Sequence, residues 1–334
     1  MKILLSATLA LLFALGATRV FGLSEETINR ELDATAGENL VVDVAFGTIE
    51  VAAGADNKVT IEAHRKIETT DEAREKQYLA EVPIVITKEG STVKLCARRL
   101  EEKSWDWTCN TMMDAQYILR VPKKFNLDLK TGGGMVAASG ITGTTLAATG
   151  GGKLKLDHLN GPLTAKTSGG NITLKNCDGS LDVRTSGGGI TATEGSGELE
   201  ARTSGGSISV RNFNGNAVVR TSGGKLIFEK INGRVSGKTS GGSIFASLLA
   251  PLPGEVELTS SAGSIELAVP SNAACNVEAK ANMGSVSNEL PIVASRAERD
   301  ELRGAINGGG KSVILRSSAG SISIRSTSAQ TAMQ

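Results

Sequence analysis

A basic side chain recurs once every 18 residues through the middle of the chain, and it is the clearest chemical pattern in the sequence. The residues concerned are Lys166, Arg184, Arg202, Arg220 and Lys238. If each 18-residue unit adds one strand to a stack, these charges lie in a line about 5 Å apart. Because arginine binds anions through two parallel hydrogen bonds, the line could hold an anionic polymer, such as a surface polysaccharide or a phosphate-bearing glycan.

The same line also has a purely structural interpretation. Charges at regular spacing would form a solvated ridge that keeps a repeat protein soluble and monomeric. Asp182 and Glu200 each stand two residues before an arginine, on the same face of a strand. They predict surface ion pairs worth little energy, which would partly neutralise the line. The sequence leaves both interpretations open.

A second candidate contact region lies between Cys96 and Cys109. A disulfide between these cysteines would close a local loop in an oxidising compartment. Within that loop, Trp105 and Trp107 are alternate residues on one face. They could stack on a sugar or a protein, or they could plug one end of the molecule.

Side chains for catalysis or metal binding are scarce. Nucleophilic catalysis needs a nucleophile, a base and an orienting group, yet the chain has only two histidines, His64 and His158. The repeated serines form a ladder whose stacked hydroxyls can hydrogen-bond along the molecule. A calcium-binding nonapeptide repeat keeps Asp where this chain has isoleucine, as at Ile172 and Ile208, and isoleucine cannot bind a hard cation. We predict no catalytic, cofactor-binding or metal-binding residue.

A strict repeat indicates the elements that would position these side chains. The phrase Thr-(Ser/Gly)-Gly-Gly begins at Thr131, Thr149, Thr167, Thr185, Thr203, Thr221 and Thr239. Each 18-residue repeat divides into two halves with glycine at the fourth position and apolar residues at the sixth and eighth. An apolar spacing of two is the strand period, and the glycines fit turns or close backbone approach. The sequence therefore predicts an all-β protein, a β-solenoid (two-sheet β-roll or β-helix) with 18-residue coils.

The N-terminus predicts export. Residues 1–22 combine an early lysine, a short apolar run and a small residue, Gly22, at the expected cut, which is typical of a cleaved signal peptide. We expect the protein in the periplasm, on the cell surface or in the medium, with no membrane span after cleavage. The other predicted parts are an N-terminal β-rich cap with first coils and one short helix at 23–130, regular repeats at 131–247, irregular C-terminal coils and a cap at 248–326, and a disordered tail at 327–334.

The charge, the two remaining cysteines and the sequence of the two ends bear on the possible partners and on self-assembly. Residues 131–247 carry 12 basic and 7 acidic side chains, an excess too small to predict nucleic acid as a partner. Cys177 and Cys275 have no evident partner and are predicted to be plain small residues. Irregular, charged sequence at both ends favours capping over an end-to-end polymer, which would need an open sheet edge.

Several ordered phrases resemble the putative adhesin family of bacterial secreted domains. They are the "TSGGSI"-type repeats, "SSAGSIEL", "GSVSNELP" and "LRGAINGGGKSVILRSSAGSISI", within residues 40–326. The resemblance implies a β-solenoid exposed outside the cytoplasm and supplies no catalytic mechanism. We expect a non-enzymatic structural or adhesive module whose partner is an anionic surface glycan or an envelope protein. The alternative is a polysaccharide-active β-helix enzyme, which would need a carboxylate cluster outside the repeats.

Overall fold

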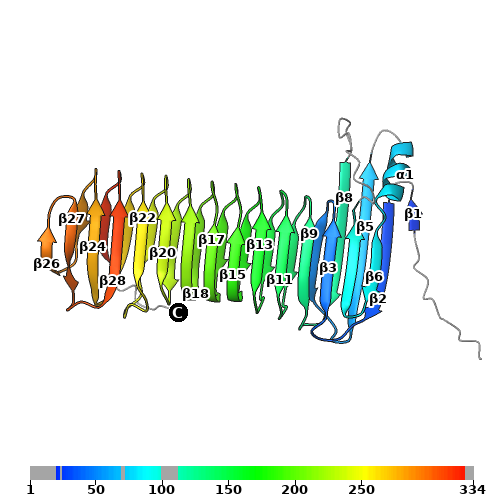
Figure 1. Cartoon of the computed structure of the whole chain (residues 1–334), viewed down its shortest axis with the longest axis horizontal. Helices are drawn as coiled ribbons and strands as arrows, with labels where there is room; N and C mark the ends of the chain where they lie inside the picture. The colour runs from blue at the N-terminus through cyan, green and yellow to red at the C-terminus, as the bar shows by residue number, and fades with distance from the viewer. Residues whose placement is uncertain (1–19, 23–24, 69–71, 99–111, 328–334) are drawn as a thin grey trace, which may run out of the picture.

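The computed structural model describes residues 20–22, 25–68, 72–98 and 112–327. Within these ranges the chain forms strands β1 to β29 and the helix α1. The strands lie side by side along the long axis of the molecule, and α1 lies at the N-terminal end (Figure 1). The protein is thus an all-β, solenoid-like stack, as the sequence predicts.

The central strands are short, and every second side chain points inward. All the apolar residues predicted to face the core are buried, among them Leu154, Ile208 and Phe228. The strands of this part are β9 (Asn126–Thr131), β10 (Val136–Ser139), β11 (Thr145–Thr149), β12 (Leu154–Asp157), β13 (Leu163–Thr167), β14 (Ile172–Lys175), β15 (Asp178–Arg184), β16 (Ile190–Thr193), β17 (Ser196–Arg202), β18 (Ile208–Thr221), β19 (Leu226–Ile231), β20 (Val235–Thr239), β21 (Ile244–Ser247), β22 (Val256–Ser260) and β23 (Ile265–Pro270).

Successive strands alternate between two parallel ladders. Ladder A contains β10, β12, β14, β16, β19, β21 and β23, and ladder B contains β9, β11, β13, β15, β17, β20 and β22; β18 contributes to both. Leu154 pairs with Ile172 in ladder A, and Leu163 pairs with Leu181 in ladder B. Because the pairing joins equivalent residues of successive repeats, each repeat position becomes a column of side chains along the molecule.

Buried hydroxyl groups connect the repeats, chiefly those of the threonines that begin each repeated phrase. Thr203 is only 7% exposed, and its hydroxyl donates to the Gly188 carbonyl of the preceding repeat at 2.8 Å. The same oxygen accepts a hydrogen bond from the Gly206 amide at 3.3 Å. Equivalent bonds recur down the column, and Ser260 and Ser317 take the place of threonine at its C-terminal end. The predicted serine column is present, since the Ser204 amide donates to the Ser186 carbonyl at 3.1 Å and the equivalent serines repeat this bond. The side chains of these serines are exposed in the turns, and the buried hydroxyls that bond along the stack are those of the threonines.

Besides the inward-facing residues of the two ladders and the threonine column, a further column of buried side chains fills one corner of the stack. It contains Leu159, Cys177, Phe213 and Ile231, all buried, with Gly195 between the cysteine and the phenylalanine. A Cβ on Gly195 would lie 2.4 Å from the Cys177 carbonyl oxygen and 3.1 Å from the Phe213 ring. The missing side chain therefore makes room for the large ring, in the way that close-packed cores balance volumes.

The N-terminal end departs from the order of the chain. In ladder B, β3 (Asn39–Val44) lies between β7 (Thr92–Ala97) and β9. In ladder A, β4 (Thr48–Ala53) lies between β8 (Met112–Val121) and β10. The remaining elements of this end are β1 (Val20–Gly22), β2 (Glu25–Asp33), β5 (Lys58–Glu68), α1 (Glu72–Glu81) and β6 (Val85–Glu89).

Two features of this end bear on the sequence predictions. Helix α1 matches the expected short helix, and its Tyr78 packs in a small cluster with Ile67. Arg65 is buried beneath it, where it contacts Glu26 at 2.5 Å and donates to the Val82 carbonyl. Strand β1 belongs to the predicted signal peptide and pairs antiparallel with β2. Cleavage after Gly22 stays a prediction.

The C-terminal end is rearranged in the same way. Its strands are β24 (Cys275–Ala281), β25 (Val286–Asn288), β26 (Ile292–Ala297), β27 (Glu301–Ile306), β28 (Lys311–Ser317) and β29 (Ile322–Thr327). Strand β28 lies between β22 and β24 (Figure 1). Strand β29 lies between β23 and β25. The outermost strand β26 contains a bulge between Ala294 and Arg296. Bulges and charges at an edge disfavour further strand pairing.

Candidate functional site

The five predicted basic residues form one continuous row on the outer face of ladder B. Lys166 pairs with Arg184, Arg184 with Arg202, Arg202 with Arg220, and Arg220 with Lys238. Their side chains point away from the core, since the flanking residues of each strand are buried. At a strand spacing of about 4.8 Å, the row is about 19 Å long. We call these five residues the basic row.

Two members of the basic row have a carboxylate partner on their own strand. Arg184 contacts Asp182 at 2.8 Å, and Arg202 contacts Glu200. The hydrogen bond that Arg184 donates to Asp182, together with the negative charge of Asp182, raises the pKa of Arg184 above the usual arginine value. The ion pairs predicted from the sequence are therefore present, and they neutralise the middle of the row.

The other three members lack such a partner. The position two residues earlier is Thr164 beside Lys166, Val218 beside Arg220 and Ser236 beside Lys238. None of these three cations makes an ion pair with any residue that the structure describes. The basic row therefore consists of a neutralised centre with one uncompensated charge on one side and two adjacent ones on the other.

The pairing register extends the line beyond the predicted residues. After Lys238 the same column continues through Thr259, Arg316 and Lys280. Arg316 contacts Glu278 at 3.3 Å, and Lys280 contacts Glu301 at 3.7 Å. Sequence spacing did not identify these two cations, because β28 is inserted between β22 and β24 and breaks the 18-residue count.

The predicted tryptophan loop lies outside the described residues. Trp105, Trp107 and Cys109 all belong to the segment 99–111, so the contact loop and the disulfide stay predictions. Cys96 is half-buried in β7 and is not joined to either of the other described cysteines, Cys177 and Cys275. Both of those are buried core residues, as expected for plain small side chains.

The histidines and carboxylates are dispersed. His158 has a φ of 51° and occupies a turn position that is also left-handed at Asn176, Glu194, Asn212 and Lys230. Its Nδ1 lies 2.8 Å from Asp157 on the surface. His64 lies in β5, where its Nδ1 is 3.1 Å from the Thr27 hydroxyl. Among the described residues, no group of three or more His, Cys, Asp and Glu side chains could hold a metal ion.

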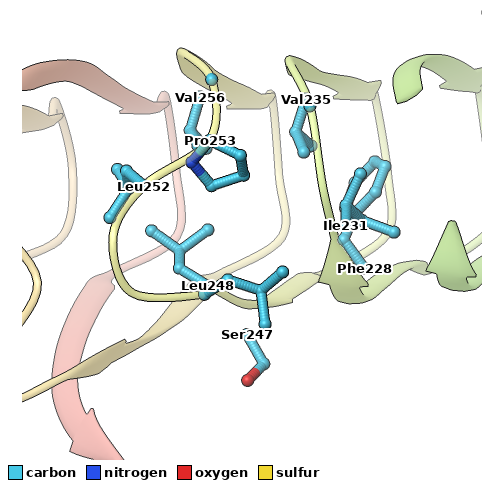
Figure 2. Close-up of a pocket in the computed structure, with 11 residues that line it drawn as sticks. Phe228, Ile231, Val235, Ser247, Leu248, Leu252, Pro253 and Val256 are labelled. Carbon is cyan, nitrogen blue, oxygen red and sulfur yellow. The ribbon is translucent and has the colours of Figure 1, made fainter. Parts of the chain in front are cut away.

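A small apolar recess lies beneath the loop that interrupts the repeat. The inserted residues around Leu252 and Pro253 fold over Phe228, Ile231 and Val256 (Figure 2). The enclosed volume is about 10 Å³, roughly the space of one water molecule. An apolar cavity of this size stays dry. It is a packing gap next to the insertion and offers no ligand-sized site.

A broader hollow lies on the outer face near the C-terminal end. Its volume is about 410 Å³, and its lining includes Asn276, Glu278, Val293 and Arg303. Glu278 and Arg303 approach each other to 3.7 Å, so the charges of this hollow neutralise one another. Val293 is 80% exposed on the outermost strand. The hollow therefore has no net charge or deep apolar wall to select a ligand.

No helix within the described ranges is long and apolar enough to cross a membrane. No curated relative matches the chain.

Several solved structures align with most of the chain at low similarity. A putative adhesin from Bacteroides fragilis is 12% identical, with a TM-score of 0.32 over 90% of this chain and 97% of that one. A putative lipid binding protein from Parabacteroides distasonis is 15% identical, with a TM-score of 0.37 over the same shares. A putative cell adhesion protein from Clostridium sporogenes is 10% identical, with a TM-score of 0.26 over 91% of this chain and 100% of that one. Scores this low carry no inference about function.

The family match covers most of the stack. Residues 38–325 match the family described as Toastrack DUF4097, from β3 in the N-terminal end to the last strand β29. The matched region includes both rearranged ends as well as the regular repeats between them. The chain belongs to the Toastrack DUF4097 family.

Proposed function

We propose that this protein is a non-enzymatic, extracytoplasmic binding module, a putative adhesin or envelope-associated β-solenoid. Its regular part is a two-sheet β-roll of 18-residue coils, and its outer face holds an anionic surface polymer. The observation that carries this proposal is the basic row, in which five cations occupy directly paired positions of adjacent strands.

A stacked β-structure suits such a polymer for a physical reason. The ladder hydrogen bonds and the buried threonine hydroxyls hold the strands at constant spacing, so the row needs no reorganisation on binding. Each exposed ion pair contributes only about 0–1 kcal/mol. A polymer that engages several cations at once adds these small terms, because later contacts form at high effective concentration. Binding should therefore weaken steeply as salt rises.

Two observations favour binding over catalysis. Asp182 and Glu200 are held by the arginines of the row, so these carboxylates are not available for acid–base chemistry. His158 occupies an exposed turn and pairs with its own neighbour. These contacts support a surface that holds a ligand and does not turn it over.

The test is binding of the purified protein to neutral and anionic glycans at fixed ionic strength. We expect selective binding to anionic glycans, weaker binding after Arg184→Ser, Arg202→Ser and Arg220→Ser are combined, and little change in the melting temperature. Unchanged binding by the folded triple variant would contradict the role of the basic row. Release of reducing ends from any glycan in the same samples would instead assign an enzyme.

Export has its own measurement. The intact mass of protein recovered from the cell envelope or medium should correspond to a chain that begins at Leu23. A mass that includes Met1 to Gly22 in a cytoplasmic fraction would contradict the proposed location.

A further inference from the structure

We infer that Arg220 and Lys238 form the anion-binding subsite of the basic row, and that they take a sulfate or phosphate monoester carried on a polysaccharide. This inference rests on the proposed function and adds the position and the chemistry of the bound group. It depends on which cations the protein itself leaves uncompensated, and only the contacts in the structure distinguish them.

Arg220 and Lys238 are directly opposite each other in β18 and β20. Both side chains are exposed on the outer face of ladder B. Like charges that face each other across adjacent strands are destabilising. Elsewhere in the row this repulsion is relieved by Asp182 and Glu200, which contact the neighbouring arginines.

At this pair the relieving carboxylates are missing. The equivalent positions hold Val218 and Ser236, and neither Arg220 nor Lys238 pairs with an acid among the described residues. The next position of the column is Thr259, and the acid two residues before it, Glu257, contacts Arg234 at 4.0 Å instead of Lys238. An external anion can therefore occupy the place that Asp182 fills beside Arg184, and it meets two cations there.

The spacing of the two cations selects the shape of that anion. A guanidinium binds two oxygens of one group through parallel hydrogen bonds, whereas an ammonium acts as a point charge. A carboxylate has only two oxygens, so the arginine alone satisfies it. A sulfate or phosphate monoester has three terminal oxygens in a tetrahedral arrangement. Two can reach Arg220 while the third reaches Lys238, about 4.8 Å away along the stack.

Phosphodiesters fit this pair less well, because they keep only two terminal oxygens. A nucleic acid therefore resembles a carboxylated polymer at this site. Lys166, the third uncompensated cation, has neutralised Arg184 on one side and Ala148 on the other, so it offers a single charge. Arg220 and Lys238 are therefore the only two adjacent members of the basic row that both lack a carboxylate partner among the described residues.

The experiment compares dextran sulfate, phosphorylated dextran and carboxymethyl dextran of equal length and substitution, by biolayer interferometry at fixed salt. The wild-type protein should bind one or both esters at least about fivefold more tightly than the carboxymethyl polymer. The two ester arms identify whether sulfate or phosphate is preferred. Tighter binding to single-stranded DNA than to either ester would assign the pair to nucleic acid and overturn the inference.

Two double variants locate the subsite. Arg220→Ser with Lys238→Ser should lower ester affinity about tenfold, since two exposed charge contacts are lost. The matched control, Lys153→Ser with Lys155→Ser, removes the same number of exposed cations from outside the basic row and should lower it less than about twofold. Equal losses in both doubles would overturn the inference and leave the proposed function standing. If the wild type binds none of the three dextrans, the proposed function itself fails.

A gain of charge provides a test that keeps both cations. Val218→Asp places a carboxylate where Asp182 stands beside Arg184, and it should reduce ester binding about as much as the Arg220→Ser and Lys238→Ser double. Unchanged ester binding by folded Val218→Asp protein would also overturn the inference. Melting temperatures of all variants establish that the stack is intact.

Discussion

The two adjacent glycines of the repeated turn have different roles, and Gly206→Ala against Gly205→Ala separates them. A Cβ on Gly206 would overlap the Gly188 carbonyl of the preceding repeat and lie 2.6 Å from the Gly189 amide nitrogen. Real Cβ atoms essentially never approach closer than 3.0 Å. A Cβ on Gly205 would have its nearest neighbour at 3.5 Å, an ordinary contact. Only the first substitution forces two strands apart.

The cost of that displacement follows from the contacts involved. Inserting an atom into a packed position costs about 1–3 kcal/mol. The displaced backbone also weakens the hydrogen bonds from Thr203 to Gly188 and from Thr221 to Gly206, each worth about 0.5–1.5 kcal/mol. We expect Gly206→Ala to lower the free energy of unfolding by about 2–6 kcal/mol.

The neighbouring substitution is the control. Gly205→Ala restricts the unfolded chain without a clash and should leave the stability within about 1 kcal/mol of the wild type. Urea unfolding followed by far-UV circular dichroism and by limited proteolysis measures both variants under identical conditions. Similar urea midpoints for the two variants would refute the argument that the stack needs close backbone approach at Gly206 and not at Gly205.

Three further predictions address the column of hydroxyls, the N-terminal end and a core cysteine. Thr203→Val leaves the Gly188 carbonyl without its hydrogen bond and should cost about 2–3 kcal/mol, whereas Thr203→Ser should cost about 1 kcal/mol in urea unfolding. Arg65→Met leaves the Glu26 carboxylate buried without its partner and should cost about 3–5 kcal/mol; adding Glu26→Leu should recover most of the lost melting temperature, and no recovery would contradict this. Burial raises the pKa of the Cys177 thiol to about 11 from 9.0, so its contribution to stability is complete below pH 9 and is lost as the pH rises towards 11. Cys177→Ala should therefore show a smaller fall in urea midpoint over that range, and an identical fall would exclude the thiol as a cause.

The regular part of the fold could be predicted because its signal is local. Alternation of buried and exposed residues, as at Ile208 and Val210, identifies strands without any knowledge of their partners. The constant repeat length then makes equivalent residues neighbours, and the basic row follows. The role of the turn hydroxyls did not follow, because exposed serine and buried threonine are adjacent in the same phrase and only the turn geometry separates them.

The ends could not be predicted for a different reason. Any β-unit with apolar residues at alternate positions can pair with several others, so the sequence does not reveal that β28 enters between β22 and β24. Neither does it reveal that β3 lies between β7 and β9. These placements depend on which strand edges must be covered at the two ends of the stack, and the strands that cover them are distant in the sequence. They bring Arg316 and Lys280 into the column of the basic row although neither follows the 18-residue count.

The sequence by itself determined the strand period, the inward columns and the alignment of the five cations, because each depends on spacing along the chain. The tertiary structure decided which cations are compensated. That depends on contacts between side chains: Asp182 and Glu200 reach Arg184 and Arg202, while Arg220 faces only Val218 on its own strand. A repeat fixes where charges stand, and the carboxylates near them determine which charges remain available to a ligand.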